Sequence, residues 1–405
     1  MAAITSIECS RCHHPVPADA LLARCPLCTG RLFVRYDLQS LQGTARRDEI
    51  SAASPRIPHQ ASAGVWRYSS LLPTITAGIT ITPITLGEGN TPMYGSRRYP
   101  GLHLKQDDAN PTGSIHARGL SVATSLAKHH GVRHLACAAQ EDIAVALAAY
   151  AAAAGLTAHL ILPQTIPFAH YLEANLYFAE ITLVDGSADD CTRILNQRIQ
   201  SQQQASLPSG QLWVDLAADH NPFYLEGLKT LGYELVEQLG WTYPAAILFP
   251  CSNDSDVILL ALGKAFDELE TLGWVSGTRP RLYVAATVAG PTSATSSDPL
   301  HPTPHNQSVS KTIAVTPADA LASTLDWGRN EGILLSPMAA AATAAYDTLL
   351  AKGELLPADT VVLINPTAAL KYTDNTAEAM HLHRPGRPAV KLPTSLPVGG
   401  IITPV

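Results

Sequence analysis

Four cysteines near the N-terminus have the spacing of ligands for a metal ion. They form two Cys-x-x-Cys pairs, Cys9 with Cys12 and Cys25 with Cys28. Each pair can fill two corners of a tetrahedron, and four thiolates complete a closed structural zinc site. We therefore predict zinc bound in a small ribbon-like segment that spans residues 1–38. The alternative is a relic of such a ribbon that is reduced and empty.

A second stretch with potential chemistry is residues 110–119, Asn-Pro-Thr-Gly-Ser-Ile-His-Ala-Arg-Gly. It follows residues 102–105, whose alternation predicts a strand, and precedes residues 120–130, whose periodicity predicts a helix. A turn that opens a helix presents free backbone N–H groups and favours anions. The stretch also contains His116, and imidazole can act as a general acid or base because its pKa lies near working pH.

This stretch resembles the segment of threonine synthases that carries the pyridoxal-phosphate (PLP) lysine, in the fold-type II family of PLP enzymes. The resemblance extends to Leu-Gly-Glu-Gly-Asn-Thr-Pro at 86–92 and Lys-Ala-Phe-Asp-Glu-Leu at 264–269, and it covers residues 9 to about 373. It implies that His116 stands where the family has its Schiff-base lysine. An imidazole cannot form a stable imine with an aldehyde, so the central group of PLP chemistry is replaced.

The resemblance also implies changes at the other contacts to PLP. The loop that contacts the 3′-oxygen of the cofactor carries Glu141 and Asp142 instead of glycine and asparagine, and a carboxylate repels an oxyanion. Asp142 alone is also an ordinary helix N-cap. The phosphate loop has no glycine and contains Asp254 and Asp256, which would meet a dianionic phosphate with like charge.

Two further positions differ from the family pattern, and these changes also disfavour PLP binding. Pro366 and Thr367 stand where the family has the hydroxyl at the pyridine nitrogen, so Thr367 is one residue out of register. His170 replaces a second family lysine. Taken together, these changes predict that PLP is not held in the family manner.

Short β-rich runs alternate with helical runs from residue 100 onward, which favours parallel sheets covered by helices. The fold class expected from the pattern and the resemblance is α/β, with two open, mainly parallel-sheet domains of the threonine synthase / tryptophan synthase β type and the N-terminal zinc-ribbon-like segment. We expect a large domain from residues 39–100 and 215–376, a small domain from residues 101–214, and an irregular tail at 377–405. Residues 289–312, rich in Ser, Thr, Pro and His, are expected to form a mobile loop.

Composition narrows the functional class. Of 405 residues, 46% are hydrophobic and only 15% are charged, which is typical of a well-buried globular protein. The net charge of -7, without a sizeable basic cluster, argues against nucleic-acid binding. The most apolar stretch, 143–162, is mostly alanine and is expected to form a buried helix and strand rather than a membrane span. No signal peptide is apparent, so a cytoplasmic protein is expected.

Our main hypothesis is a re-purposed enzyme that works without PLP. It would carry out a lyase-type elimination, dehydration or substitution on a small polar, amino-acid-like or phosphorylated substrate in a cleft between the two domains. His116 is the expected general acid/base, with Asp142 and His170 as further catalytic residues. The expected substrate-binding residues are Asn90, Thr91, Lys105, Ser114, Arg118, Glu141, Asn253, Asp254, Asp256 and Thr367.

Two alternatives stay open. One is a non-catalytic paralogue that binds a metabolite or a partner protein. The other is a PLP-dependent threonine synthase in which Lys105 or Lys371 takes over the imine. Relatives of this fold type are often dimers, so a homodimer is compatible with each reading.

Overall fold

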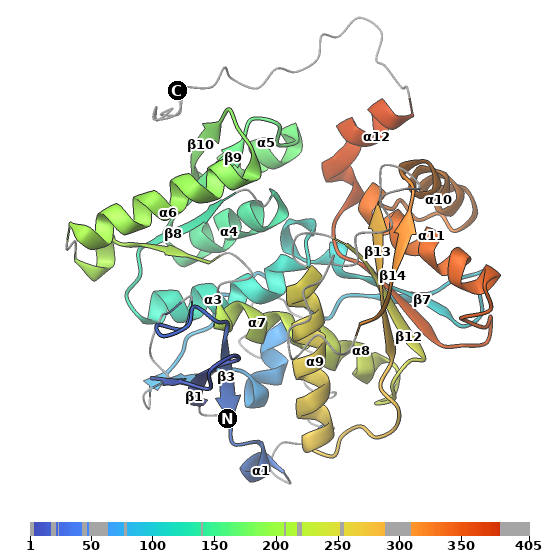
Figure 1. Cartoon of the computed structure of the whole chain (residues 1–405), viewed down its shortest axis with the longest axis horizontal. Coiled ribbons are helices and arrows are strands. Elements are labelled where there is room, and N and C mark those ends of the chain that lie inside the picture. The colour runs from blue at the N-terminus through green and yellow to red at the C-terminus, as the bar shows by residue number, and fades with distance from the viewer. Residues whose placement is uncertain are drawn as a thin grey trace, which may run out of the picture. The chain divides into compact units, whose positions relative to one another are not determined.

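The computed structural model describes residues 4–17, 22, 24–42, 47, 64–76, 79–138, 141–205, 208–216, 221–251, 255–287 and 309–380. The chain forms two compact units. Unit 1 takes residues 1–88, 116–228 and 384–405, and unit 2 takes residues 89–115 and 229–383. Each unit has its own main sheet, and Figure 1 shows the elements of both.

Unit 1 opens with an antiparallel three-stranded sheet of order β2-β1-β3. Its strands are β1 (Ile4–Cys9), β2 (Pro15–Val16) and β3 (Leu32–Tyr36), followed by the short helix α1 (Leu38–Leu41). The 3-10 helix η1 (Gly64–Leu71) and the small hairpin of β4 (Ile75–Thr76) and β5 (Ile79–Thr80) lead toward the main sheet.

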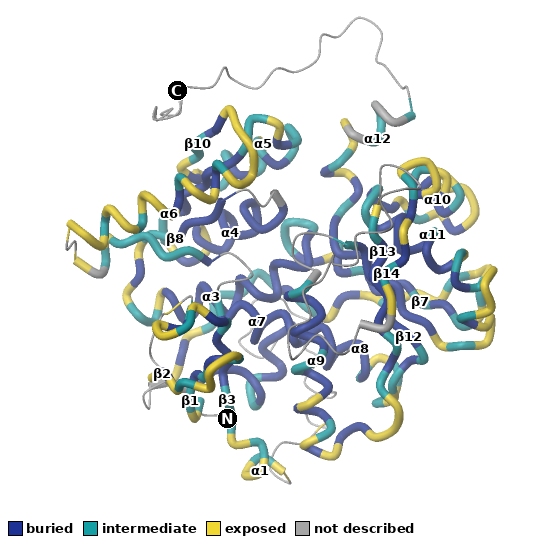
Figure 2. The backbone as a smooth tube through the Cα atoms, viewed as in Figure 1, coloured by how far each residue is buried: buried dark blue, intermediate teal, exposed yellow. Residues whose placement is uncertain are grey.

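The main sheet of unit 1 is fully parallel, with strand order β10-β9-β8-β11. Its strands are β8 (His134–Ala138), β9 (Thr157–Pro163), β10 (Glu180–Val184) and β11 (Trp213–Asp215). The helices are α3 (His116–His129), α4 (Glu141–Ala154), α5 (Phe168–Leu176), α6 (Ala188–Gln204) and α7 (Pro222–Leu228), with the 3-10 turn η4 (Ser209–Gln211). Nearly all of α3 and α4 is buried (Figure 2).

Unit 2 contains a six-stranded sheet of order β14-β13-β12-β15-β7-β6. The strands are β6 (Met93–Gly95), β7 (Leu102–Gln106), β12 (Ala246–Pro250), β13 (Arg281–Thr287), β14 (Val309–Val315) and β15 (Val361–Asn365). All neighbouring strands pair in parallel except β6, which runs antiparallel at the edge.

The helices of unit 2 follow or separate these strands in the sequence. They are α8 (Thr230–Gln238), α9 (Ser255–Thr271), α10 (Pro317–Asn330), α11 (Pro337–Ala351) and α12 (Thr373–Ala379), with 3-10 turns η2 (Asp107–Ala109), η3 (Pro111–Gly113) and η6 (Ala369–Tyr372). Alanine-rich α11 packs against β12 to β15, because small side chains let a helix lie close to a sheet.

The α/β class with mainly parallel sheets is confirmed, because alternating β-rich and helical runs form the expected elements. One prediction was wrong. Residues 309–312, assigned to a loop, begin β14, which pairs in parallel with β13. The loop composition of 289–308 concealed the alternation of Lys311 to Val315. Residues 288–308 and 381–405 lie outside the described part of the chain, and the expected domain boundaries stay a prediction.

No helix in the described ranges is both long enough and apolar enough to span a membrane.

Candidate functional site

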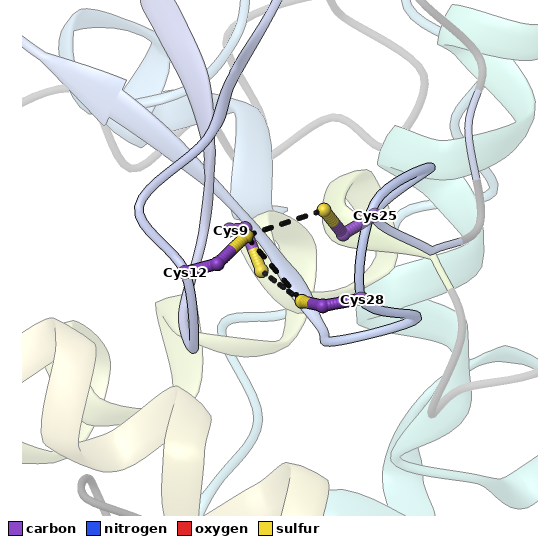
Figure 3. A group of neighbouring side chains, drawn as sticks. All are labelled: Cys9, Cys12, Cys25 and Cys28. Carbon is purple, nitrogen blue, oxygen red and sulfur yellow. Dashed lines mark hydrogen bonds between the residues drawn. The ribbon is translucent and has the colours of Figure 1, made fainter.

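The four cysteines of the N-terminal ribbon converge on one point (Figure 3). All four sulfur atoms lie within 4.8 Å of one another. The Sγ atom of Cys28 is 3.4 Å from those of Cys9 and Cys12, and the Sγ atoms of Cys12 and Cys25 are 3.6 Å apart. Sulfur ligands at about 2.3 Å from a tetrahedral ion would be separated by about 3.8 Å, so the cluster can hold a metal ion.

The backbone repeats itself around the two cysteine pairs. His13 and Thr29 each lie four residues after the first cysteine of a pair, and both adopt a positive φ of 55° and 58°. Their N–H groups donate to the carbonyls of Cys9 and Cys25, respectively. Only glycine fits at position 30, because the Cβ of any other residue would lie 2.9 Å from the Sγ atom of Cys9. These turns aim the sulfur atoms inward.

The local hydrogen bonds also prepare a thiolate. Burial opposes ionisation of Cys9, but the backbone N–H groups of Cys12 and Arg11 lower the pKa of the Cys9 thiol to about 6. Thiolates are the form that binds metal. The preparation applies to Cys9 alone, because the backbone N–H of His14 lowers the pKa of Cys12 but its contacts with Cys28, Cys9 and Cys25 outweigh this and raise it to about 12.

The ribbon is fastened to helix α7 within unit 1. The hydroxyl of Tyr36, the last residue of β3, donates to Oε2 of Glu226 at 2.6 Å. Glu226 is fully buried on α7. The N-terminal ribbon therefore braces the helix that also carries Tyr224.

His116 is the first residue of α3, and it is 7% exposed. Its Nδ1 atom lies 2.5 Å from the hydroxyl of Tyr224, which is fully buried. Tyr224 is held by a close approach of the two helices: a Cβ at Gly119 would lie 2.5 Å from the tyrosine ring, and a Cβ at Gly227 would lie 2.1 Å from the carbonyl oxygen of Arg118. The sequence did not single out Tyr224, and only the spacing from Asn221, whose Oδ1 caps α7, could have drawn attention to it.

Asp142 and His170 form a second buried pair in unit 1. Asp142 is the second residue of α4, and His170 lies on α5. The Nε2 atom of His170 is 3.0 Å from Oδ1 of Asp142, and the His170 side chain is fully buried. Two of the three expected catalytic residues are thus partners of each other.

A third polar network in unit 1 surrounds Glu88, which belongs to the Gly-Glu-Gly motif. It accepts hydrogen bonds from the Tyr150 hydroxyl and the N–H of Leu86. Burial raises the pKa of Glu88 and, together with the nearby Glu88 charge, that of Tyr150. Arg118, fully buried on α3, acts electrostatically on Tyr150 in the opposite direction.

The turn at residues 110–115 lies in unit 2, where Thr112 and Gly113 adopt positive φ values of 59° and 58°. Ser114 bridges Thr367 in antiparallel fashion, and the N–H of Ile115 donates to the carbonyl of Pro366. The turn and the segment after β15 are therefore neighbours. Ser114 and Thr367 are 0% and 2% exposed.

Asn90, Thr91 and Lys105 gather around Glu234 of α8. The carboxylate of Glu234 accepts the N–H groups of Asn90 and Thr91 at 2.7 and 2.8 Å. The ammonium of Lys105 donates to Oε1 of Glu234 at 2.5 Å, to the Thr91 carbonyl at 2.7 Å and to Gln238 at 2.9 Å. Lys105 is fully buried, so its three N–H donors are engaged in a scaffold.

The remaining expected site residues are less completely described. Asp256 is the second residue of α9 and is half-buried. Glu141 opens α4, but its side chain, like Asn253 and Asp254, lies outside the described residues. The expected cleft would combine residues of both units, and it stays a prediction.

The chain belongs to a known family of enzymes. A family model described as pyridoxal-phosphate dependent enzyme matches residues 84–367. This range includes both parallel sheets, the turn at 110–115 and the start of α3.

Several curated relatives are threonine synthases. The chain is 27% identical to that of Methanosarcina acetivorans, with 90% of this chain and 92% of the relative covered. It is 26% identical to that of Methanocaldococcus jannaschii, covering 92% and 94%. It is 29% identical to that of Mycobacterium tuberculosis (strain H37Rv), covering 80% and 93%. The chain is thus a homologue of threonine synthases over nearly its whole length.

Proposed function

We propose that this threonine synthase homologue is an enzyme that no longer uses PLP and that His116 is its general acid/base. The observation that carries the proposal is the buried contact between His116 and Tyr224 at the first residue of α3. A primary amine is needed there for an imine, and the chain offers an imidazole bonded to a phenol.

The surrounding residues support this proposal because they do not fit the cofactor. Asp142 puts a carboxylate at the start of α4, where the family resemblance requires a donor to the 3′-oxygen of PLP. Among the described residues of unit 1, Lys128 is the one lysine, and its ammonium donates to the carbonyl of Ala154. In the chemistry proposed for His116, no step passes through PLP.

The hydrogen bond with the Tyr224 hydroxyl makes His116 suitable for proton transfer. A hydroxyl both donates and accepts, so it can match either neutral tautomer of His116 as well as the imidazolium. The ring can then take up and release a proton at Nε2 while the contact at Nδ1 persists. Asp142 orients His170 in a similar way, since a carboxylate accepts the Nε2–H group.

The substrate class follows from the relatives, which are named threonine synthases. We propose a small amino-acid-like or phosphorylated substrate, from which His116 removes a proton in an elimination, dehydration or substitution. Arg118, which shares α3 with His116, is a candidate for holding its anionic end. Asn90, Thr91 and Lys105 are better explained as scaffold around Glu234.

The test is turnover by the full chain freed of PLP. Phosphate release would be measured with a panel of phosphorylated hydroxyamino acids for the wild type, His116→Ala and Asp142→Asn. We expect the variants to be slower by about 10²–10⁴-fold, the usual contribution of general acid–base catalysis. His103→Ala, on β7 of unit 2, is the control and should retain the wild-type rate. Equal rates in the wild type and His116→Ala would refute the role of His116.

One observation favours a second candidate, a PLP enzyme with a relocated lysine. Lys371 on η6 is 9% exposed, and its Cε lies 3.6 Å from the position of a Cβ at Gly113. It therefore lies beside the turn at 110–115. Lys105 is a weaker candidate for this role because its ammonium is bound to Glu234.

The non-catalytic alternative also has a specific support. His116 with Tyr224, and Asp142 with His170, satisfy each other as polar partners in a disused pocket would. This alternative predicts no turnover in any variant.

For the ribbon we propose structural zinc, since four thiolates in a closed set suit that ion. Denaturation of the purified protein in the presence of a chromogenic zinc indicator should release one zinc per chain. Cys28→Ser should lower that yield to near zero, while Cys251→Ser, outside the cluster, should not change it.

A further inference from the structure

Four side chains line one face of the parallel sheet of unit 1, near the amino ends of its strands. His134, Glu180 and Trp213 are the first residues of β8, β10 and β11. Trp213 lies opposite His134, and Glu180 lies opposite His159 on β9. His159 pairs with Ala136, two residues after His134, so both histidines point to the same face.

Their rings and charges are in direct contact. The Nδ1 atom of His134 is 3.0 Å from Nε2 of His159, and Nδ1 of His159 is 3.0 Å from the Glu180 carboxylate. The ring of Trp213 stacks on His159 with a centroid separation of 3.8 Å and an interplanar angle of 17°. The guanidinium of Arg198 on α6 lies 5.0 Å from the centroid of the Trp213 ring.

This arrangement is the one that metal-binding histidines adopt. A ligating imidazole commonly donates its other ring N–H to a carboxylate, which fixes the tautomer and orients the ring. Here Glu180 holds Nδ1 of His159, and the stacked Trp213 limits rotation of the ring. The Nε2 atom of His159 is thereby directed toward Nδ1 of His134.

We propose that His134 and His159 form a binding site for a divalent transition metal, with Glu180 as the carboxylate that orients His159. Two nitrogens 3.0 Å apart, each bonded to an ion at about 2.1 Å, subtend an angle of about 90° at that ion. A right angle suits the square or octahedral geometry of Ni²⁺ or Cu²⁺ better than tetrahedral Zn²⁺. No third side chain within the described ranges joins the two nitrogens, so water completes the coordination.

An ion can reach the pair of histidines from solvent. His134 is only half-buried, which gives an ion a route to the pair.

The site is separate from the proposed catalytic residues. Asp142 follows the carboxyl end of β8, whereas His134 begins that strand. The inference therefore does not depend on the proposed function.

The probe is Ni²⁺ alone, titrated into the full chain whose cysteines are already loaded with zinc. Binding is followed by calorimetry and by quenching of the Trp213 fluorescence, which a Trp213→Phe variant identifies among the five tryptophans. We expect one Ni²⁺ per chain in the wild type and binding weaker by about tenfold in Glu180→Gln. His129→Ala, a half-buried histidine of the same unit, is the matched control and should bind as the wild type does.

Loss of Ni²⁺ binding in both His134→Ala and His134→Gln, with far-UV circular dichroism unchanged, supports the site. The glutamine variant keeps a polar side chain of similar size, so a folding defect would not explain both losses. Equal Ni²⁺ binding by the wild type and His134→Gln, or no binding by either, overturns the proposal.

Discussion

Two sets of buried polar contacts differ between the units. In unit 2, three lysines form ion pairs with glutamates: Lys105 with Glu234 at 2.5 Å, and Lys229 and Lys264 with Glu268 at 2.9 and 2.8 Å. In unit 1, two histidines have buried partners of another kind, with His116 on the phenol of Tyr224 and His170 on the carboxylate of Asp142.

This difference indicates which buried polar groups stabilise the fold. A lysine next to a glutamate stays charged across the physiological range, so it fixes geometry and exchanges no protons. A histidine beside a tyrosine or an aspartate instead joins two groups of the kind that act in general acid–base catalysis. We therefore propose chemistry for the pairs of unit 1 and a structural role for those of unit 2.

The largest effect is expected from Glu268→Gln in unit 2. Burial raises the pKa of Glu268, but the ammonium groups of Lys229 and Lys264 outweigh it and lower the pKa to about 2. Removing the charge leaves two lysines without their anion, which should cost about 3–5 kcal/mol in the free energy of unfolding. Urea denaturation at pH 7 measures the loss.

The pH dependence of the same carboxylate gives a second readout. A lowered pKa contributes stability above the unfolded pKa of about 4.3, and this is lost as pH falls toward about 2. That acid-dependent loss should be smaller in Glu268→Gln. Glu270→Gln, which removes a more exposed partner of Arg279, is the control and should change stability by less than about 1 kcal/mol. A Glu268→Gln protein as stable as this control would contradict a structural role for the buried ion pairs of unit 2.

A smaller effect is expected at the contact between α3 and α7 in unit 1. The Cβ of Gly119→Ala would lie 2.5 Å from the Tyr224 ring, so the helices must shift. Overpacking of this kind costs about 1–3 kcal/mol. The variant should also lose turnover by displacing Tyr224 from His116. Unfolding by urea and the turnover assay test both effects.

The matched control is Gly263→Ala on α9, where a Cβ would meet nothing within 4 Å. It should raise stability by about 0.5–1 kcal/mol, because alanine favours the helix. Similar stability changes in the two alanine variants would contradict the close packing at Tyr224.

The smallest effect is expected from Glu88→Gln in unit 1, and it has the opposite sign to that of Glu268→Gln. Burial raises the pKa of Glu88, so ionisation costs stability as pH rises above the unfolded value of about 4.3. Glutamine removes that cost and keeps an acceptor for Tyr150. We expect a modest gain at pH 8 and almost none at pH 4, measured by urea unfolding. A loss of stability at pH 8 would show that the Glu88 charge is required.

Much of the fold was predictable because periodicity and turn residues act locally. The runs at His134, Thr157 and Ala246 became strands of parallel sheets, and Gly131 and Gly155 take positive φ just beyond helix ends. The strand at Val309 was missed because its first residues share the composition of the preceding segment.

The site was only partly predictable because its partners lie far apart in sequence. His116 is 108 residues from Tyr224, and His134 is 25 residues from His159. No local pattern marks Tyr224, since a tyrosine in an apolar helix is usually a core residue. The cysteine cluster was easier to predict because both pairs of ligands and their spacing are local.

Above all, we propose that the chain works without PLP. The most direct test is to add PLP to the purified full chain, record the visible absorption spectrum, reduce with borohydride and map modified lysines by mass spectrometry. We predict no imine band and no specific pyridoxyllysine. An imine band with a single adduct, at Lys371 or at any other lysine, would contradict the claim and return the protein to PLP catalysis.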